Sequence, residues 1–116
     1  KTENIRVLSI VGRFLEHSRI YIFGVGERRR YYIGSADFMT RNMVKRVEVA
    51  TPIYDTAIKD RVRTMFGIML HDTVKGRELC RDGNYYRREK PQEESEVISS
   101  QAYFSNEAYL AASKNV

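Results

Sequence analysis

Two short runs rich in β-branched and aromatic residues, separated by a turn with two glycines, constrain the fold more than any other feature of this chain. The first run, RIYIF, covers residues 19–23, and the second, RYYIGSA, covers residues 30–36. Runs of this composition on either side of a glycine-containing turn predict a β-hairpin. A third run, RVEVATPI at residues 46–53, predicts another strand that is closed by Pro52. We therefore expect a small sheet of three short strands.

Apolar residues at helical spacing predict helices on both sides of these strands. A first helix is expected over residues 5–15, a short helical turn within residues 37–46, and a longer helix after Asp55, which is a typical N-cap residue. After His71 the pattern predicts mostly loop, with one short strand near Tyr85, and then a last helix over residues 93–114. The expected fold class is α/β, with a short mixed β-sheet flanked by helices.

Length and charge narrow the class of protein. A chain of 116 residues is at most one domain, so residues 1–116 are expected to form a single domain, whole or partial. The net charge is +5, and three basic clusters, ERRRYY, RNMVKR and YYRREK, carry much of the excess. Such clusters attract polyanions, among which nucleic acid, inorganic polyphosphate and acidic membrane surfaces remain open.

The sequence also bears on where the protein works. Cys80 is the single cysteine and cannot form an internal disulfide, which fits a reducing compartment. No apolar run approaches the length that crosses a bilayer, and the first residues do not resemble a signal peptide. We expect a cytoplasmic protein without a membrane span, and membrane association stays open.

Polar residues with phosphate chemistry recur within about thirty residues, around the ends of the expected strands. His17 can act as a nucleophile or a proton donor to a phosphoryl group, because histidine exchanges protons near neutral pH. Glu48 can hold that ring, and the other candidates can bind phosphate oxygens as fixed donors. Each residue alone also fits a structural role. The phosphate-binding candidates are Arg19, Ser35, Arg41 and Asn42.

The spacing of these residues resembles the half-site of the phospholipase D superfamily. That family has a His-x-Lys pair, a Gly-Ser-x-Asn element and a later Glu, and this chain has His17-Ser18-Arg19, then GSAD at residues 34–37, then Glu48. It departs from the pattern at Arg19, where Lys is expected, at Asp37, where Asn is expected, and at Gly24, where Asp is expected. These departures speak against simple phosphodiesterase activity.

Three longer strings resemble the last domain of polyphosphate kinase, an enzyme family with two phospholipase D-like domains. They are SIVGRFLEHSRIYIFG, IGSADFMTRNMVKRVEVATPI and DTVKGR, and the similarity runs through about the first eighty residues. The resemblance implies a phospholipase D-like fold and an ATP:polyphosphate phosphotransferase that reversibly moves the ATP γ-phosphate to polyphosphate through a phosphohistidine. It implies that the nucleophilic histidine lies in a preceding domain and that His17 assists the transfer while Glu48 orients it.

The same resemblance implies which partners and cofactor the protein has, and whether this chain is active by itself. ATP or ADP, inorganic polyphosphate and the other domains of a longer parent chain are the expected partners, and a homo-oligomer is expected. Mg²⁺ is the expected cofactor of the full-length enzyme, with no metal ligands in this chain. The isolated 116 residues are expected to be inactive.

Two other functions remain open from the sequence. The first is a phospholipase D-type phosphodiesterase half-site that acts with a symmetric partner. The second is a non-catalytic basic module that binds nucleic acid or another polyanion, with Tyr31, Tyr32, Tyr85 and Tyr86 as stacking platforms.

Overall fold

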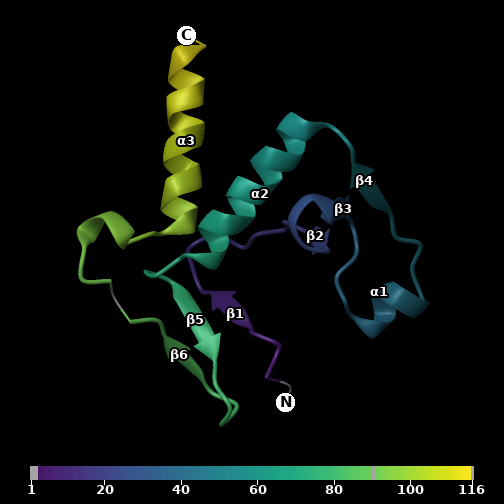
Figure 1. The fold of residues 1–116 in the computed structure, drawn as a ribbon, viewed down its shortest axis with the longest axis horizontal. Coiled ribbons are helices and arrows are strands. Elements are labelled where there is room, and N and C mark those ends of the chain that lie inside the picture. The colour runs from purple at the N-terminus through teal and green to yellow at the C-terminus, as the bar shows by residue number, and fades with distance from the viewer. Residues whose placement is uncertain (1–2, 90, 116) are drawn as a thin grey trace. The chain divides into compact units, whose positions relative to one another are not determined.

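The computed structural model describes residues 3–89 and 91–115, and these residues form two compact units (Figure 1). The central unit comprises residues 16–66. The second unit joins the segment before Glu16 to the part of the chain from Gly67 onward, and we call it the terminal unit. Each unit is built around its own three-stranded antiparallel sheet.

The sheet of the central unit consists of β2 (Ile20–Phe23), β3 (Arg30–Gly34) and β4 (Ala50–Ile53), in the order β2-β3-β4. The turn between β2 and β3 contains the short 3-10 helix η1 (Gly26–Arg28) and has positive φ angles at Gly24 (87°) and Gly26 (55°). Glycine adopts these angles without a steric cost, so the two glycines allow the chain to reverse here.

The pairing of these strands sorts their side chains onto two faces. Tyr31 of β3 lies opposite Ile22 of β2 and Ile53 of β4, and it is 7% exposed. The other face carries Tyr21 opposite Tyr32. Because Arg19 is two residues before Tyr21, the alternation of a strand puts its side chain on the same side as the Tyr21 ring.

Two helices complete this part of the chain. α1 (Thr40–Val44) follows β3, and α2 (Thr56–Leu70) follows β4 and continues into the terminal unit. The side chain of Asp55 accepts a hydrogen bond from the backbone N–H of Ile58 at 2.9 Å, so Asp55 caps α2 as the sequence predicts. Val62 is the buried residue of α2.

The terminal unit has a sheet of β1 (Leu8–Ile10), β5 (Gly76–Leu79) and β6 (Tyr85–Arg87), in the order β1-β5-β6. An ion pair from Arg6 to Glu78 supports the pairing of β1 with β5. The 3-10 helix η2 (Glu94–Glu96) and the helix α3 (Ser100–Lys114) follow. Gln101 of α3 exchanges hydrogen bonds of 2.8 Å and 3.0 Å with the backbone of Phe14, which ties the helix to the segment after β1.

A buried carboxylate connects three segments of the terminal unit. Asp72 is fully buried, and its Oδ1 accepts hydrogen bonds from the backbone N–H groups of Lys75 (2.7 Å) and Gly76 (3.1 Å). Its Oδ2 accepts from the backbone N–H (2.7 Å) and hydroxyl (2.8 Å) of Ser100, the first residue of α3. Burial acts to raise the pKa of Asp72, but these hydrogen bonds outweigh it and leave the pKa below its ordinary value.

Several predictions from the sequence are confirmed and others are wrong. The α/β class, the β2–β3 hairpin, the helical turn at α1, the cap at Asp55 and the strand near Tyr85 are confirmed. The third strand is shorter than expected, because β4 begins at Ala50, and Pro52 lies within it. The last helix begins at Ser100 rather than at residue 93.

Three predictions about the secondary structure and the sheet need correction. Residues 5–15 do not form a helix, since residues 8–10 form β1, which pairs with β5. β5 lies where the sequence predicts loop. A single mixed sheet is also wrong, because every strand pair among the described residues is antiparallel and the strands divide between two sheets.

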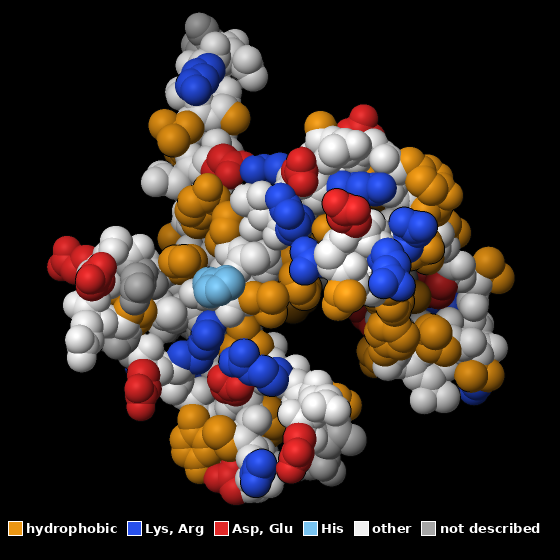
Figure 2. All heavy atoms as spheres, in the orientation of Figure 1, with side chains coloured by type: hydrophobic (Ala, Val, Ile, Leu, Met, Phe, Trp, Pro, Cys, Tyr) orange, Lys and Arg blue, Asp and Glu red, His pale blue; other side chains and the backbone are white. Residues whose placement is uncertain are grey.

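Much apolar surface of the described residues is open to solvent. Figure 2 shows hydrophobic side chains on the surface beside many Lys and Arg side chains. Leu15 and Tyr54, for example, are 85% and 79% exposed. Among the described helices, none has both the length and the apolar character that crossing a bilayer requires.

Candidate functional site

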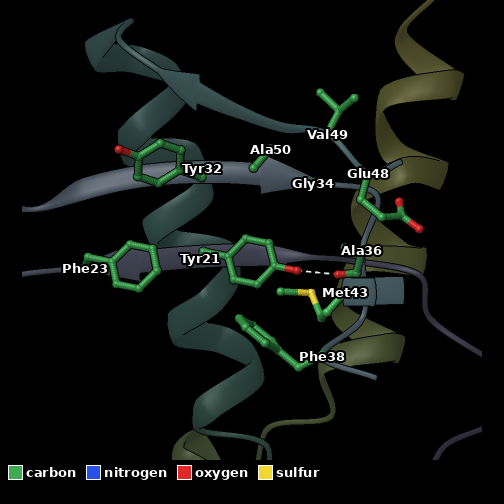
Figure 3. Close-up of a pocket in the computed structure, with 10 residues that line it drawn as sticks. All are labelled: Tyr21, Phe23, Tyr32, Gly34, Ala36, Phe38, Met43, Glu48, Val49 and Ala50. Atoms are coloured by element: carbon green, nitrogen blue, oxygen red, sulfur yellow. Dashed lines mark hydrogen bonds between the residues drawn. The ribbon is translucent and has the colours of Figure 1, made fainter. Parts of the chain in front are cut away.

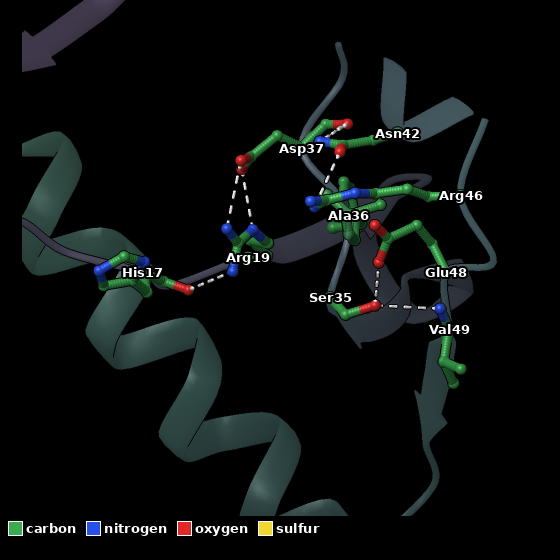
Figure 4. Close-up of polar contacts among 10 residues, drawn as sticks. His17, Arg19, Ser35, Ala36, Asp37, Asn42, Arg46, Glu48 and Val49 are labelled. Atoms are coloured by element: carbon green, nitrogen blue, oxygen red, sulfur yellow. Dashed lines mark hydrogen bonds and ion pairs between the residues drawn. The ribbon is translucent and has the colours of Figure 1, made fainter. Parts of the chain in front are cut away.

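The predicted site residues lie around one end of the central sheet, and Figure 4 labels all of them except Arg41. His17 and Arg19 come directly before β2, while Ser35 and Asp37 come directly after β3. Because β2 and β3 are antiparallel, the start of one strand lies beside the end of the other. The backbone N–H of Gly34 donates to the carbonyl oxygen of Arg19 at 3.1 Å, which closes this end of the hairpin.

Arg19 and Asp37 form a two-pronged ion pair across the ends of β2 and β3. The guanidinium Nε lies 2.8 Å from Oδ1 of Asp37, and Nη2 lies 3.2 Å from Oδ2. The hydrogen bond from Arg19 lowers the pKa of the Asp37 carboxyl below its ordinary value, and the charges of His17 and Arg41 act in the same direction. All three basic residues are therefore within electrostatic reach of one carboxylate.

Ser35 and Glu48 form a second polar contact at this end of the sheet. The Ser35 hydroxyl donates to the Glu48 carboxylate and accepts a hydrogen bond from the backbone N–H of Val49 at 3.1 Å. The backbone N–H of Ser35 donates to the Val49 carbonyl at 3.0 Å, which extends the pairing beyond the end of β3. Glu48 is thus held by Ser35.

His17 is exposed, and the structure does not bring it together with Glu48. No hydrogen bond or ion pair joins the two side chains among the residues that the structure describes, and Figure 4 shows them well apart. The carbonyl oxygen of His17 accepts a hydrogen bond from Nη1 of Arg19 at 3.5 Å. Orientation of His17 by Glu48 therefore stays a prediction, without a direct contact in this structure.

Asn42 and Arg41 are neighbours in α1 but differ sharply in exposure. Asn42 is 4% exposed, and its Nδ2 donates to the carbonyl oxygen of Asp37 at 3.3 Å. Its Oδ1 accepts from Nη1 of Arg46 at 3.5 Å. Arg41 is exposed. In this chain Asn42 braces the backbone at Asp37, whereas Arg41 is free to approach an anion in solvent.

Sequence reasoning missed two residues that hold this end of the sheet. The Tyr21 hydroxyl donates to the Ala36 carbonyl oxygen, and Arg46 contacts Asn42. Tyr21 was recoverable because residues two apart on a strand share a face, which puts Tyr21 beside Arg19. Arg46 was recoverable from its i+4 spacing to Asn42 across the end of a helix.

An apolar hollow with a volume of about 310 Å³ adjoins the polar residues (Figure 3). Tyr21, Phe23 and Tyr32 form its wall on the sheet, Phe38 and Met43 lie across from them, and Glu48 is at its edge. The Tyr21 and Phe38 rings meet edge to face with centroids 5.4 Å apart. Since Tyr31 is buried on the other face, it is not available as a stacking platform for a nucleic acid base.

The described residues hold no cluster of metal-ligating side chains. They contain no group of three or more His, Cys, Asp or Glu side chains placed to hold a metal ion. The carboxylates nearest the predicted site are already bound, Asp37 by Arg19 and Glu48 by Ser35.

Comparisons with known proteins agree on one family. Residues 1–101 match the family model of polyphosphate kinase C-terminal domain 2. A polyphosphate kinase of Bacillus cereus is 53% identical over 85 residues, which cover 73% of this chain and 12% of that protein. A polyphosphate kinase of Synechocystis is 44% identical over 107 residues, which cover 92% of this chain and 15% of that protein.

The fold matches as well as the sequence. The crystal structure of polyphosphate kinase from Porphyromonas gingivalis matches this chain with a TM-score of 0.82 and 31% sequence identity. The match covers 97% of this chain and 17% of the chain in that crystal structure. This chain therefore spans between about an eighth and a sixth of the length of these relatives. From the match over residues 1–101 and the shared fold, the chain belongs to the polyphosphate kinase family, at its C-terminal domain 2.

Proposed function

We propose that this chain is part of a longer polyphosphate kinase that reversibly transfers the γ-phosphate of ATP to inorganic polyphosphate. The observation that carries the proposal is the family match over residues 1–101, because that range contains the whole cluster from His17 to Glu48. In this proposal the phosphate passes through a phosphohistidine whose nitrogen belongs to another domain of the parent. ATP or ADP, polyphosphate and the remaining domains are then the partners.

His17 is the proposed proton donor in the transfer. When the phosphoryl group moves, its bond to the histidine nitrogen of the other domain breaks and a bond to a terminal phosphate oxygen forms. The His17 ring, which is exposed, would donate a hydrogen bond or a proton to a phosphoryl oxygen and take the proton back in the reverse direction. Such transfers depend mainly on positioning and on stabilising the charge on the phosphoryl oxygens.

Arg41 and Ser35 are the proposed contacts to phosphate. The Arg41 guanidinium is exposed, and its charge helps to lower the pKa of the Asp37 carboxyl, which supports a role for it near this end of the sheet. Arginine suits phosphate oxygens because its planar group offers several donors in a fixed arrangement. The Ser35 hydroxyl would have to leave Glu48 to donate to phosphate, so we assign it the smaller part.

The test is ATP formation by the full-length enzyme from long-chain polyphosphate and ADP with Mg²⁺. His17→Ala should lower the rate by about 100-fold or more, since a positioned acid or base contributes on that order. His71→Ala is the matched control, because His71 lies in the terminal unit and its Nδ1 contacts the Gly67 carbonyl at 2.7 Å. His71→Ala should retain most of the rate.

The assay tests the proposed function and the proposed role of His17 separately. An inactive wild-type enzyme contradicts the proposed function. An active wild type with an equally active, folded His17→Ala variant leaves the function intact and shows that His17 has only a structural role.

A further inference from the structure

The ion pair between Arg19 and Asp37 joins two residues that depart from the phospholipase D pattern, in which Lys is expected at residue 19 and Asn at residue 37. Both carboxylate oxygens of Asp37 are engaged, by Nε and Nη2 of Arg19, in the geometry that gives arginine its specificity for carboxylates. The Arg19 side chain is 26% exposed and that of Asp37 is 47% exposed, so the contact lies at the surface, with the arginine as its more covered partner.

This ion pair is connected to the backbone on both sides. On the Arg19 side, Nη1 donates to the carbonyl oxygen of His17 at 3.5 Å. On the Asp37 side, the carbonyl oxygen accepts from the buried Asn42. The pair therefore links the backbone that carries His17 to the segment that follows β3 (Figure 4).

The charges of the pair argue against phosphate binding by Arg19. A carboxylate that accepts two hydrogen bonds from a guanidinium weakens the attraction of that guanidinium for an anion. The carboxylate itself also repels phosphate oxygens. An entering phosphate would have to displace Asp37 from two hydrogen bonds. Arg41, by contrast, is exposed and offers its cation without that cost.

We propose that Arg19 is a positioning residue, whose ion pair with Asp37 fixes the backbone at His17 relative to the Gly34–Asp37 segment, and that it does not bind polyphosphate. The inference rests on the proposed function for the identity of the reaction. It goes further because it separates Arg19 from the phosphate contacts and gives Asp37 a part in the site.

Asp37→Asn in the full-length enzyme distinguishes the two roles, because they predict opposite effects. If the pair positions His17, the variant lowers kcat by about 10-fold to 100-fold, as small misplacements of reacting groups do, and leaves the affinity for polyphosphate unchanged. If Arg19 is a phosphate ligand that Asp37 restrains, the variant frees the guanidinium. Polyphosphate then binds more tightly, and the salt dependence of binding becomes steeper, because more cations contact the polyanion.

The charge-reversed double variant tests whether the two residues act through each other. Arg19→Asp and Asp37→Arg should each lower kcat, and the combined variant should recover at least about five-fold over either single variant, since residues in direct contact couple to that extent. Glu78→Gln is the matched control. It removes the charge from an ion pair of the same two-pronged form, to Arg6 in the terminal unit, and should leave kcat unchanged.

A readout without turnover keeps the inference separate from the proposed function. We expect Asp37→Asn to raise amide hydrogen exchange at Gly34, whose N–H donates to the Arg19 carbonyl, while exchange in α3 stays as in the wild type and shows that the protein is folded. Loss of kcat at constant affinity, with faster exchange at Gly34, supports the inference. Tighter polyphosphate binding with unchanged exchange overturns it, even if the wild-type enzyme makes no ATP and the proposed function fails.

Discussion

Single residues decide how the ends of the elements are held, and Asp72 is the clearest case. Its carboxylate accepts four hydrogen bonds from three residues and takes the place of a side-chain cap at α3, where Ser99 makes none. A buried carboxylate with this many donors is stabilising only while it is ionised. The fold of the terminal unit should therefore depend on pH through this residue.

Asp72→Asn should lower the free energy of unfolding by about 2 kcal/mol at neutral pH, because the amide nitrogen would face backbone or hydroxyl donors. The folded-state pKa of Asp72 is lowered, so its contribution is fully present above the unfolded value, about 4, and is lost as pH falls through the folded value. The difference between wild type and variant should stay constant from pH 7 to pH 5 and shrink below about pH 4.

Urea unfolding followed by circular dichroism at pH 7, 5 and 3 measures this difference. Asp60→Asn is the control, because Asp60 pairs with Arg63 on the surface of α2 at 3.3 Å and should contribute well under about 1 kcal/mol. A difference that grows as the pH falls would show that Asp72 is protonated in the folded protein at neutral pH.

In the terminal unit, the start of β5 lies so close to the backbone of Asp72 that only glycine fits there without a clash. A Cβ at Gly76, the first residue of β5, would clash with the Asp72 carbonyl oxygen, and because this oxygen belongs to the backbone, the chain itself would have to shift. A Cβ at Gly67, within α2, would meet nothing within 4 Å. The same substitution should therefore have opposite effects at the two positions.

Gly76→Ala should destabilise the protein by more than about 2 kcal/mol, because the connection from α2 to β5 must shift. Gly67→Ala should stabilise it by up to about 1 kcal/mol, because alanine loses less backbone entropy in a helix than glycine. Thermal unfolding of both variants beside the wild type gives the two signs. A stabilising Gly76→Ala would contradict the close contact with Asp72.

The elements that were predictable are those with local signals. β2, β3 and the cap at Asp55 follow from β-branched and aromatic runs, a glycine turn and a capping residue, each within a few positions. β1 and β5 could not be predicted this way. β5 reads GREL, with little strand preference, and β1 exists because Leu8 pairs with Glu78, a contact between distant parts of the chain.

The same distinction between local signals and distant contacts applies to the candidate site. The residue types and their spacing placed the candidate side chains around the ends of the expected strands, and strand ends in a hairpin do meet. The partners inside the cluster were not predictable. Whether Arg19 turns to phosphate or to a carboxylate depends on Asp37, which sits after a different strand, and the pairing of Glu48 with Ser35 depends on the register of β3 and β4.

At the scale of the whole molecule, we expect this chain to supply only some of the parts that the proposed phosphoryl transfer needs. It has two histidines, and the central unit contains one of them, His17, which we assign to assist the transfer. The nucleophile would then come from the rest of the parent enzyme. We therefore expect no ATP from long-chain polyphosphate, ADP and Mg²⁺ when the isolated 116 residues are assayed with luciferase, while the full-length enzyme is active under the same conditions.

A complementation experiment tests whether His17 of this chain is needed for the turnover. Mixing the 116 residues with the parent chain that lacks them should restore part of the turnover, and the same mixture with His17→Ala in the 116 residues should not. Turnover by the isolated chain that disappears in His17→Ala would contradict the assignment, because His17 would then itself carry the phosphoryl group. Turnover that survives in His17→Ala but disappears in His71→Ala would move the chemistry to the terminal unit, where His71 follows α2.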